Sequence, residues 1–171
     1  MRQHYDIIIA IDPDTEKSGV AVLEPATRHI EAMSLTFPQL LDFLRERDIR
    51  AKAGGSSLAV IVEAGWIVHK SNWHGADGHR AERIAKNVGA NHETGRKIVE
   101  MCRHWGIHVE EQRPLQKMWR GKGGKITAAE LKAITGLTSR TNQDERDAAL
   151  LAWVWAGLPV RIRTEDNNET K

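Results

Sequence analysis

The segment Leu58–Glu63 (LAVIVE) constrains the fold of this chain more than any other, because an unbroken apolar run ends in a glutamate. A continuous apolar run of this length is typical of a strand that is buried on both faces. Such strands lie in the middle of parallel sheets that helices cover on both sides. We therefore expect Leu58–Glu63 to be the central parallel strand of an α/β sheet.

The remaining elements follow from the spacing of apolar residues, which is two in strands and about 3.6 in helices. In chain order we expect strands at 5–11, 18–23 and 28–35, a helix from Phe37, the central strand, a helix at about 81–105, a strand at 107–111, a short helix from Thr127 and a last helix at 144–155. The first two strands predict a β-hairpin. Between residues 64 and 78, Gly, Trp and His follow no period, so we expect a loop.

This order of elements predicts a mixed five-stranded sheet, antiparallel over its first three strands and then parallel, flanked by helices. A length of 171 residues suits one domain with a substantial core. We expect a single α/β domain over residues 1–163 and a polar, disordered tail over residues 164–171.

The composition is that of a soluble protein. Charged residues make up 28% and hydrophobic residues 40%, both ordinary values, and no apolar run is long enough to span a membrane. The first apolar run is broken by an aspartate and a proline, unlike a secretory signal. The single cysteine, Cys102, excludes an intrachain disulfide framework and suits a reducing compartment. We therefore expect a cytoplasmic protein with no membrane association.

Positive charge is concentrated in one segment, although the net charge is only +2. From Arg113 to Arg140 there are seven basic residues and one acid, Glu130. A segment of this kind suits the phosphates of nucleic acid, and a solvated loop is the other interpretation. Both interpretations stay open on composition alone.

Four carboxylates occupy positions that predict a metal site. Asp12 and Glu63 end two apolar strands, and their side chains meet if those strands lie side by side. Asp144 and Asp147 lie three residues apart in the first turn of the last helix and so share a face. Clustered carboxylates suit Mg²⁺, which takes oxygen ligands and keeps positions for water and phosphate. We expect these four residues to be catalytic metal ligands.

The acids also have ordinary structural interpretations. Asp12 before Pro13 suits the start of a turn, and Asp144 suits a helix cap. Glu63 has no turn or cap to form, and a charge beside a buried strand needs a partner or a metal. Glu63 is therefore the member of the set that the pattern supports most strongly.

Three blocks of the sequence resemble the RuvC-type Holliday junction resolvases of the ribonuclease H-like superfamily. They are IIIAIDPDTEKSGVAVL, LAVIVEAGW and Asp144-x-x-Asp147-Ala148 followed by an apolar helix, and they stand in the family's order within residues 5–157. The chain departs from the family pattern at Asp14, where a glycine is usual. Because Asp tolerates turns well, we expect the hairpin to form, with extra negative charge near the metals.

The resemblance implies a Mg²⁺-dependent endodeoxyribonuclease that cleaves branched DNA, above all Holliday junctions. It implies two Mg²⁺ ions in each active site, with Mn²⁺ as a substitute, held by Asp12, Glu63, Asp144 and Asp147, and a homodimer that places two sites on one junction. Trp66 matches an aromatic residue that stacks on junction DNA, while core packing is its other interpretation. We expect DNA backbone contacts from Lys117, Arg120, Lys122 and Lys125.

Two other functions stay open. A nuclease of the same fold could act on another structured DNA or on an RNA–DNA hybrid, because fold does not fix substrate. A non-catalytic nucleic-acid-binding module is the second alternative. Clustered carboxylates argue against this module, because they would repel the phosphates that it has to bind.

Overall fold

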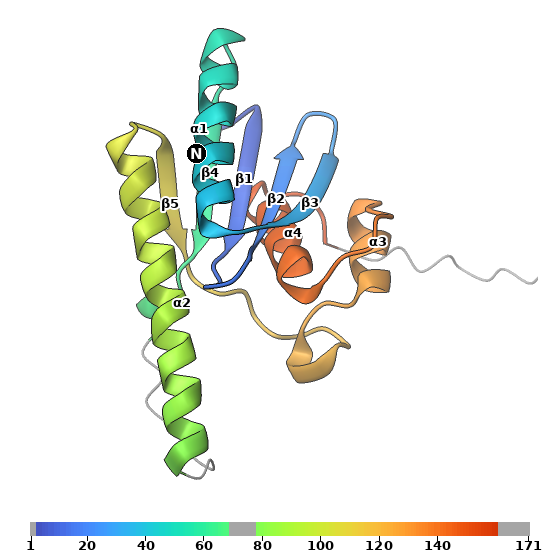
Figure 1. The fold of residues 1–171 in the computed structure, drawn as a ribbon. Coiled ribbons are helices and arrows are strands. Elements are labelled where there is room, and N and C mark those ends of the chain that lie inside the picture. The colour runs from blue at the N-terminus through green and yellow to red at the C-terminus, as the bar shows by residue number, and fades with distance from the viewer. Residues whose placement is uncertain (1–2, 69–77, 161–171) are drawn as a thin grey trace, which may run out of the picture.

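The computed structural model describes residues 3–68 and 78–160, which form one sheet with helices on both faces (Figure 1). The strands are β1 Ile7–Asp12, β2 Ser18–Glu24, β3 His29–Leu35, β4 Leu58–Glu63 and β5 His108–Gln112. The helices are α1 Phe37–Ala53, α2 Gly78–His104, α3 Ala128–Thr135 and α4 Gln143–Trp155, with short 3₁₀ turns at Gly65–Ile67 and Lys122–Gly124. The predicted tail and residues 69–77 of the predicted loop lie outside the described residues.

The sheet has the strand order β3-β2-β1-β4-β5. The pairs β1–β2 and β2–β3 are antiparallel, and the pairs β1–β4 and β4–β5 are parallel. Ile9 of β1 lies between Val22 of β2 and Val60 of β4, so β1 joins the predicted hairpin to β4, which is the middle one of the three parallel strands. The predicted mixed five-stranded sheet is confirmed, with β1 at its centre and β4 beside it.

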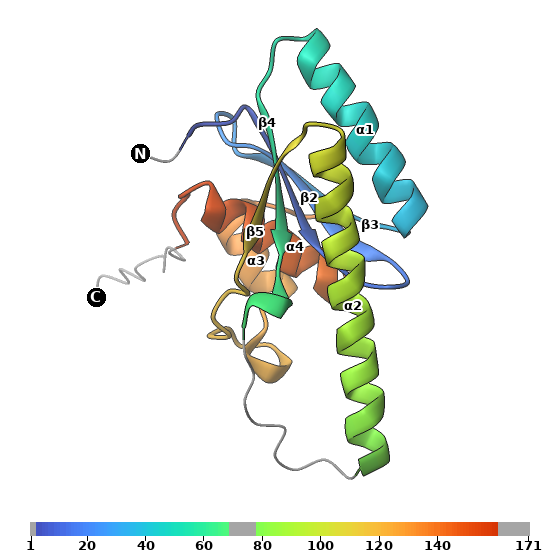
Figure 2. The same cartoon turned by 90° about the vertical axis from the view of Figure 1, so that its left-hand side faces the viewer.

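Successive residues of the inner strands pack into two separate cores, because strand side chains alternate between the faces of a sheet. Ile8 and Ala10 of β1 pack against α4, with Ala148 and Leu151 among their neighbours in that core. Ile9 and Ile11 contribute to the opposite core, which α1 and α2 cover. Figure 2 shows this layering, with α1 and α2 on one side of the sheet and α3 and α4 on the other.

Helix α2 is longer than the sheet that it covers. Its buried residues, Gly95, Ile98, Val99 and Cys102, all lie in its C-terminal half. The N-terminal half extends past the end of the strands (Figures 1 and 2). The helix begins at Gly78, three residues before the predicted start.

Cys102 is fully buried, and burial raises the pKa of its thiol to about 12, so its role is packing.

Over residues 3–68 and 78–160, no helix has the length and apolar content needed to cross a lipid bilayer.

Candidate active site

Asp12 and Glu63 end neighbouring parallel strands and point to the same face of the sheet. Asp12 has the parity of Ala10, and Glu63 has the parity of Ile61, and both of these apolar residues pack in the core beneath α4. The predicted juxtaposition of the two strand ends is thus present, because β1 and β4 are directly paired. Both carboxylates are partly buried and face the helix that carries the other two acids.

Gly19 of β2 lets α4 approach the sheet closely at this point. Gly19 is the cross-strand partner of Asp12. A Cβ atom at residue 19 would overlap the backbone carbonyl of Asp144. The first turn of α4 therefore rests on the backbone of β2, which carries its acidic side chains to the end of β1.

The N-cap of α4 is Asn142, not Asp144. The Asn142 side chain accepts a hydrogen bond from the Glu145 backbone N–H at 2.9 Å, and the Glu145 carboxylate accepts one from the Asn142 N–H at 3.1 Å, which forms a capping box. The capping interpretation of Asp144 is therefore wrong. Asp144 lies inside the first turn with its side chain available to the site.

Asp12, Asp144 and Asp147 form a compact cluster. Each offers one carboxylate oxygen, and these three oxygens lie within 4.8 Å of one another. Glu63 is not part of this tight group, although its charge acts on Asp12. No described residue donates a hydrogen bond to the side chains of Asp12, Glu63 or Asp144. Carboxylate oxygens that converge in this way, most of them without a hydrogen-bond donor from the protein, fit a divalent cation such as Mg²⁺.

The electrostatics of the cluster agree with this assignment. The pKa of Asp12 is raised well above its ordinary value, first by burial and then by the charges of Glu63, Asp144 and Asp147. Burial also raises the pKa of Glu63 and of Asp144. A bound cation would relieve both the burial of charge and the repulsion between like charges.

Lys125 forms an ion pair with the cluster. Its Nζ lies 2.9 Å from Asp147 Oδ2, and the Lys125 side chain is only 37% exposed. Burial lowers the pKa of Lys125, but the hydrogen bond and the charge of Asp147 outweigh it, so the net shift is upward. The Lys125 charge in turn offsets part of the upward pKa shift of Glu63 and of Asp12. Lys125 thus belongs to the acidic site itself rather than to a separate surface.

The segment that carries Lys125 is folded. We call residues 113–125 the basic loop. Its two sides are joined by hydrogen bonds from the backbone N–H of Trp119 to the Gly124 carbonyl and from that of Gly121 to the Lys125 carbonyl, each 2.9 Å long. Glu130 of α3 anchors the loop by accepting a hydrogen bond from the Arg120 N–H at 3.1 Å.

The other predicted DNA contacts of the basic loop are exposed. The side chains of Lys117, Arg120 and Lys122 all lie at the surface. Lys117 is near enough to the site for its charge to offset part of the upward pKa shift of Glu63. An exposed, folded, basic loop beside the acidic cluster favours the phosphate-binding interpretation over that of a plain solvated loop.

Trp66 is partly buried and lies three residues after Glu63. It packs against the α2 core, and a Cβ on Gly95 would meet its ring. The ring of His92 lies edge-on to it at 6.0 Å between centroids, and the Arg96 guanidinium lies 5.5 Å from its centroid. Trp66 therefore has a packing role in the fold, and its contact with DNA stays a prediction.

Asp14 replaces the usual glycine without strain. Its φ is not positive, and its Oδ1 accepts a hydrogen bond from the Glu16 N–H at 2.8 Å. Asn91 of α2 donates to Oδ2 at 3.3 Å. The turn is thus stabilised by the aspartate, as aspartate side chains commonly do. The charge of Asp14 also contributes to the raised pKa of Asp144, so the expected extra negative charge near the cluster is present.

The sequence pattern does not single out Gln143 or Arg146, yet Gln143 contacts a carboxylate of the site and Arg146 contacts Gln143. Gln143 Nε2 donates to Asp147 Oδ1 at 2.8 Å, and Arg146 Nη2 donates to Gln143 Oε1 at 2.9 Å. The spacing of Gln143 and Asp147, i and i+4 on one helix, is the signal that could have revealed the first contact.

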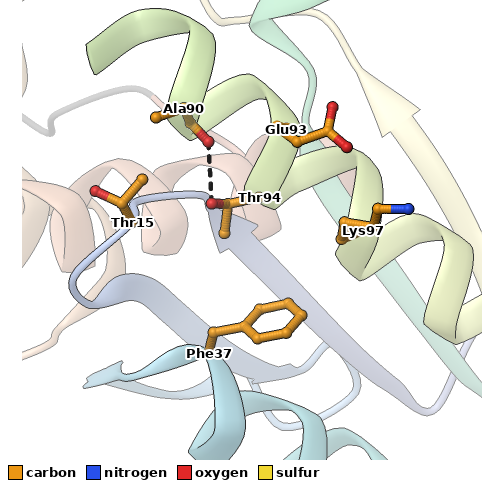
Figure 3. Close-up of a pocket in the computed structure, with 6 residues that line it drawn as sticks. All are labelled: Thr15, Phe37, Ala90, Glu93, Thr94 and Lys97. Atoms are coloured by element: carbon orange, nitrogen blue, oxygen red, sulfur yellow. Dashed lines mark hydrogen bonds between the residues drawn. The ribbon is translucent and has the colours of Figure 1, made fainter. Parts of the chain in front are cut away.

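A separate pocket of about 360 Å³ lies on the other side of the sheet, between α1, α2 and the β1–β2 turn (Figure 3). Its lining residues are Thr15, Phe37, Ala90, Glu93, Thr94 and Lys97. None of them belongs to the acidic cluster, and Thr94 is satisfied by the Ala90 carbonyl at 3.0 Å. The pocket is not part of the candidate active site.

Comparison with known proteins agrees with this geometry at the level of fold. No protein-family model matches the sequence, and no protein of curated function matches it. The mixed sheet, with antiparallel and parallel strands in this order, is of the ribonuclease H-like class.

Among solved structures, the chain is similar to the RuvC of T. thermophilus in complex with a Holliday junction substrate, with a TM-score of 0.52 and 18% identity over 87% of this chain and 90% of that one. A Thermus thermophilus RuvC structure gives 0.42, with 16% identity over 89% and 97% of the two chains. The Fowlpox virus resolvase with Holliday junction DNA gives 0.45, with 12% identity over 88% and 97%. The first of these similarities shows that the chain has the fold of RuvC.

Proposed function

We propose that this protein is a metal-dependent endonuclease that cleaves branched DNA, with the Holliday junction as its main substrate. The observation that carries the proposal is the cluster of Asp12, Asp144 and Asp147, whose carboxylate oxygens lie within 4.8 Å of one another on a RuvC-like fold. The Holliday junction substrate in the complex of the T. thermophilus protein supports the choice of substrate.

In this proposal Asp12, Asp144 and Asp147 hold two Mg²⁺ ions, or Mn²⁺ in their place, and Glu63 completes the ligand set from the end of β4. Ions bound there would supply an activated water for attack on the phosphodiester and stabilise the leaving oxygen. The four carboxylates fix where the scissile phosphate can lie. Asp12 and Glu63 contribute to the site from the ends of β1 and β4, and Asp144 and Asp147 contribute from the first turn of α4.

The cationic side chains hold the DNA backbone in this scheme. Lys125 contacts the scissile phosphate, a role that its ion pair with Asp147 of the cluster supports. The exposed basic loop contacts neighbouring phosphates through Lys117, Arg120 and Lys122. Such contacts position the DNA but do not recognise its base sequence. Trp66, which is only partly buried, stacks on a base of the junction.

Junction cleavage requires two incisions, so we also propose that the protein acts as a homodimer, in the cytoplasm, on DNA. Size-exclusion chromatography with light scattering tests the dimer. A monomer at the concentration used for cleavage would contradict paired incision.

The decisive experiment compares three substrates of equal length: a mobile four-way junction, a linear duplex and an RNA–DNA hybrid, each with Mg²⁺ or with EDTA. We expect symmetrical incision of the junction with Mg²⁺ and none with EDTA. Preference for the hybrid would instead support the other nuclease of this fold. Binding of all three without cleavage would support the non-catalytic module and overturn the proposal.

Site variants test the residue roles in the same assay. Asp12→Asn and Glu63→Gln should lower the rate by more than the roughly hundredfold that loss of an outer-shell partner costs, with junction binding retained. Asp42→Asn, an exposed position on α1, is the matched control and should cut at the parent rate. Parent-like cleavage by both site variants would show that the metal-site assignment is wrong.

A further inference from the structure

The side chain of Gln143 joins the acidic cluster to the end of the basic loop. Its Nε2 donates to Asp147 Oδ1 at 2.8 Å and to the backbone carbonyl of Ile126 at 3.2 Å. Its Oε1 accepts a hydrogen bond from Arg146 at 2.9 Å. Because an arginine has only donors, the orientation of this amide is determined: the oxygen faces Arg146, and the nitrogen faces Asp147. Both ends of the amide are therefore in use.

Arg146 holds this arrangement with three separate donors. Nη2 binds Gln143, Nε donates to the Ile126 carbonyl at 3.2 Å, and Nη1 donates to the Thr141 carbonyl at 2.7 Å. One planar guanidinium thus connects the first turn of α4, the segment before it and the chain that follows the basic loop. A lysine could not reach three acceptors in these directions.

The same two residues act on both partners of the ion pair in the site. Asp147 has one donor on each oxygen, Gln143 on Oδ1 and Lys125 on Oδ2, so its carboxylate cannot rotate freely. Lys125 precedes Ile126, whose carbonyl accepts hydrogen bonds from Gln143 and from Arg146. The backbone beside Lys125 is therefore anchored to the helix that carries Asp147.

We propose that Gln143 and Arg146 are positioning residues of the active site. Gln143 orients the Asp147 carboxylate toward the divalent cation, and Arg146 acts through Gln143 and Ile126 to keep Lys125 in register with it for a phosphate. The inference rests on the proposed function, because it concerns the same metal site. Residues that orient metal ligands in this way commonly change metal affinity by about 10–100-fold when they are replaced.

The test measures binding of Mn²⁺ to the protein alone by isothermal titration calorimetry. Gln143→Met keeps the length of the side chain and removes its donors, and Arg146→Lys keeps the charge and removes the fork. Both variants should bind Mn²⁺ about 10–100-fold more weakly than the parent. Arg50→Lys, which alters an exposed ion pair with Glu46 on α1, is the matched control and should bind Mn²⁺ as the parent does.

If Gln143 and Arg146 only stabilised the fold, the folded variants would bind Mn²⁺ as tightly as the parent does. Melting in EDTA is recorded for each variant, and the titrations are made well below the lowest melting temperature, so that only folded protein is compared. If Arg146 acts through Gln143, the double variant should bind Mn²⁺ no more weakly than the weaker single variant, whereas independent contributions would add. Mn²⁺ affinities within twofold of the parent in both single variants would overturn the proposal.

The two levels of inference fail differently. A parent protein that binds Mn²⁺ but cuts no nucleic acid would remove the proposed function and leave the positioning roles to be judged from the affinities. A parent that cuts junctions, with variants that bind Mn²⁺ and cut at the parent level, would remove the positioning roles and leave the proposed function standing.

Discussion

The strand ends and the first turn of α4 both supply carboxylates to one site, but the fold treats them differently. Asp12 and Glu63 receive no side-chain hydrogen bond from residues 3–68 or 78–160, and burial raises the pKa of each. Asp147 of α4 has a donor on both oxygens. The charges of the strand-borne acids therefore lack a hydrogen-bond donor, and a bound cation would compensate them, whereas Asp147 is stabilised by Lys125 and Gln143. Asp144 is intermediate, with a raised pKa and a place in the helical turn.

The largest expected effect is at Gly19, where the two regions touch. Gly19→Ala would place a Cβ against the Asp144 carbonyl, which is backbone and cannot rotate away. We expect a loss of about 3 kcal/mol in the free energy of unfolding, at the upper end of overpacking costs, together with weaker binding of Mn²⁺. Urea denaturation and calorimetry measure the two effects.

Gly89→Ala is the control for this change, because residue 89 lies in exposed helix with open space around it. It should stabilise the protein by about 1 kcal/mol, since alanine is the better helix former. A Gly19→Ala variant as stable as the parent would mean that α4 does not rest on β2.

Metal should stabilise the strand-borne region most. At a free Mn²⁺ concentration of about 100 times Kd, binding to the folded state alone adds about 2.7 kcal/mol, which corresponds to a rise of roughly 5–10 °C in Tm. Asp12→Asn should abolish this rise, and Asp42→Asn on the surface of α1 should retain it. An equal rise for the parent and Asp12→Asn would place the stabilising ion outside the cluster.

The comparison is sharpest without metal. In EDTA near pH 7, Asp12→Asn should raise Tm, because it removes a buried, repelled charge. Asp147→Asn should lower Tm by roughly 2–4 °C, since it removes the partner of Lys125; this value allows for the partial exposure of that pair. Differential scanning calorimetry measures both shifts.

The effect of Asp12 depends on pH with a definite sign. Its pKa is raised in the folded state, so the folded protein binds the proton more tightly than the unfolded chain does. The stability gained from protonated Asp12 is complete below the ordinary aspartate pKa and is lost as pH rises through the folded value. The advantage of Asp12→Asn should therefore grow over this range and be absent in acid, and an advantage independent of pH would contradict the raised pKa.

The same contrast explains how far the sequence could predict the site. The strand-borne acids were predictable, because an apolar run such as LAVIVE identifies a buried strand. The last residue of that run lies where the strand ends, at the carboxyl end of the sheet. Adjacency of β1 and β4 then brings Asp12 and Glu63 together. For Trp66, the sequence left packing and DNA contact open, because ring packing on Gly95 depends on the path of α2.

The helix-borne half was less predictable, because it depends on contacts between segments. Lys125 was expected to contact phosphate, but its ion pair with Asp147 depends on how the basic loop folds back. Gln143 and Arg146 resemble ordinary polar residues of a helix surface, and their role appears only when the Ile126 carbonyl lies beside them. The start of the helix was misplaced for a similar reason: Asn142 and Asp144 are both good capping residues, and local preference does not rank them.

The smallest expected effect tests that choice of cap. Asn142→Ala removes the oxygen that accepts from the Glu145 N–H and the amide that donates to Ser34 Oγ at 2.8 Å, so it should cost about 1 kcal/mol in stability. Asp144→Ala removes no hydrogen bond to the described residues and relieves repulsion with Asp12, so in EDTA it should not lower Tm. If Asp144→Ala lost stability in EDTA and Asn142→Ala did not, Asp144 would be the cap and could not also offer its carboxylate to the metals. Asp144 would then belong with Asp147 among the acids that the protein itself stabilises. Only Asp12 and Glu63 would remain without a hydrogen-bond donor from the described residues.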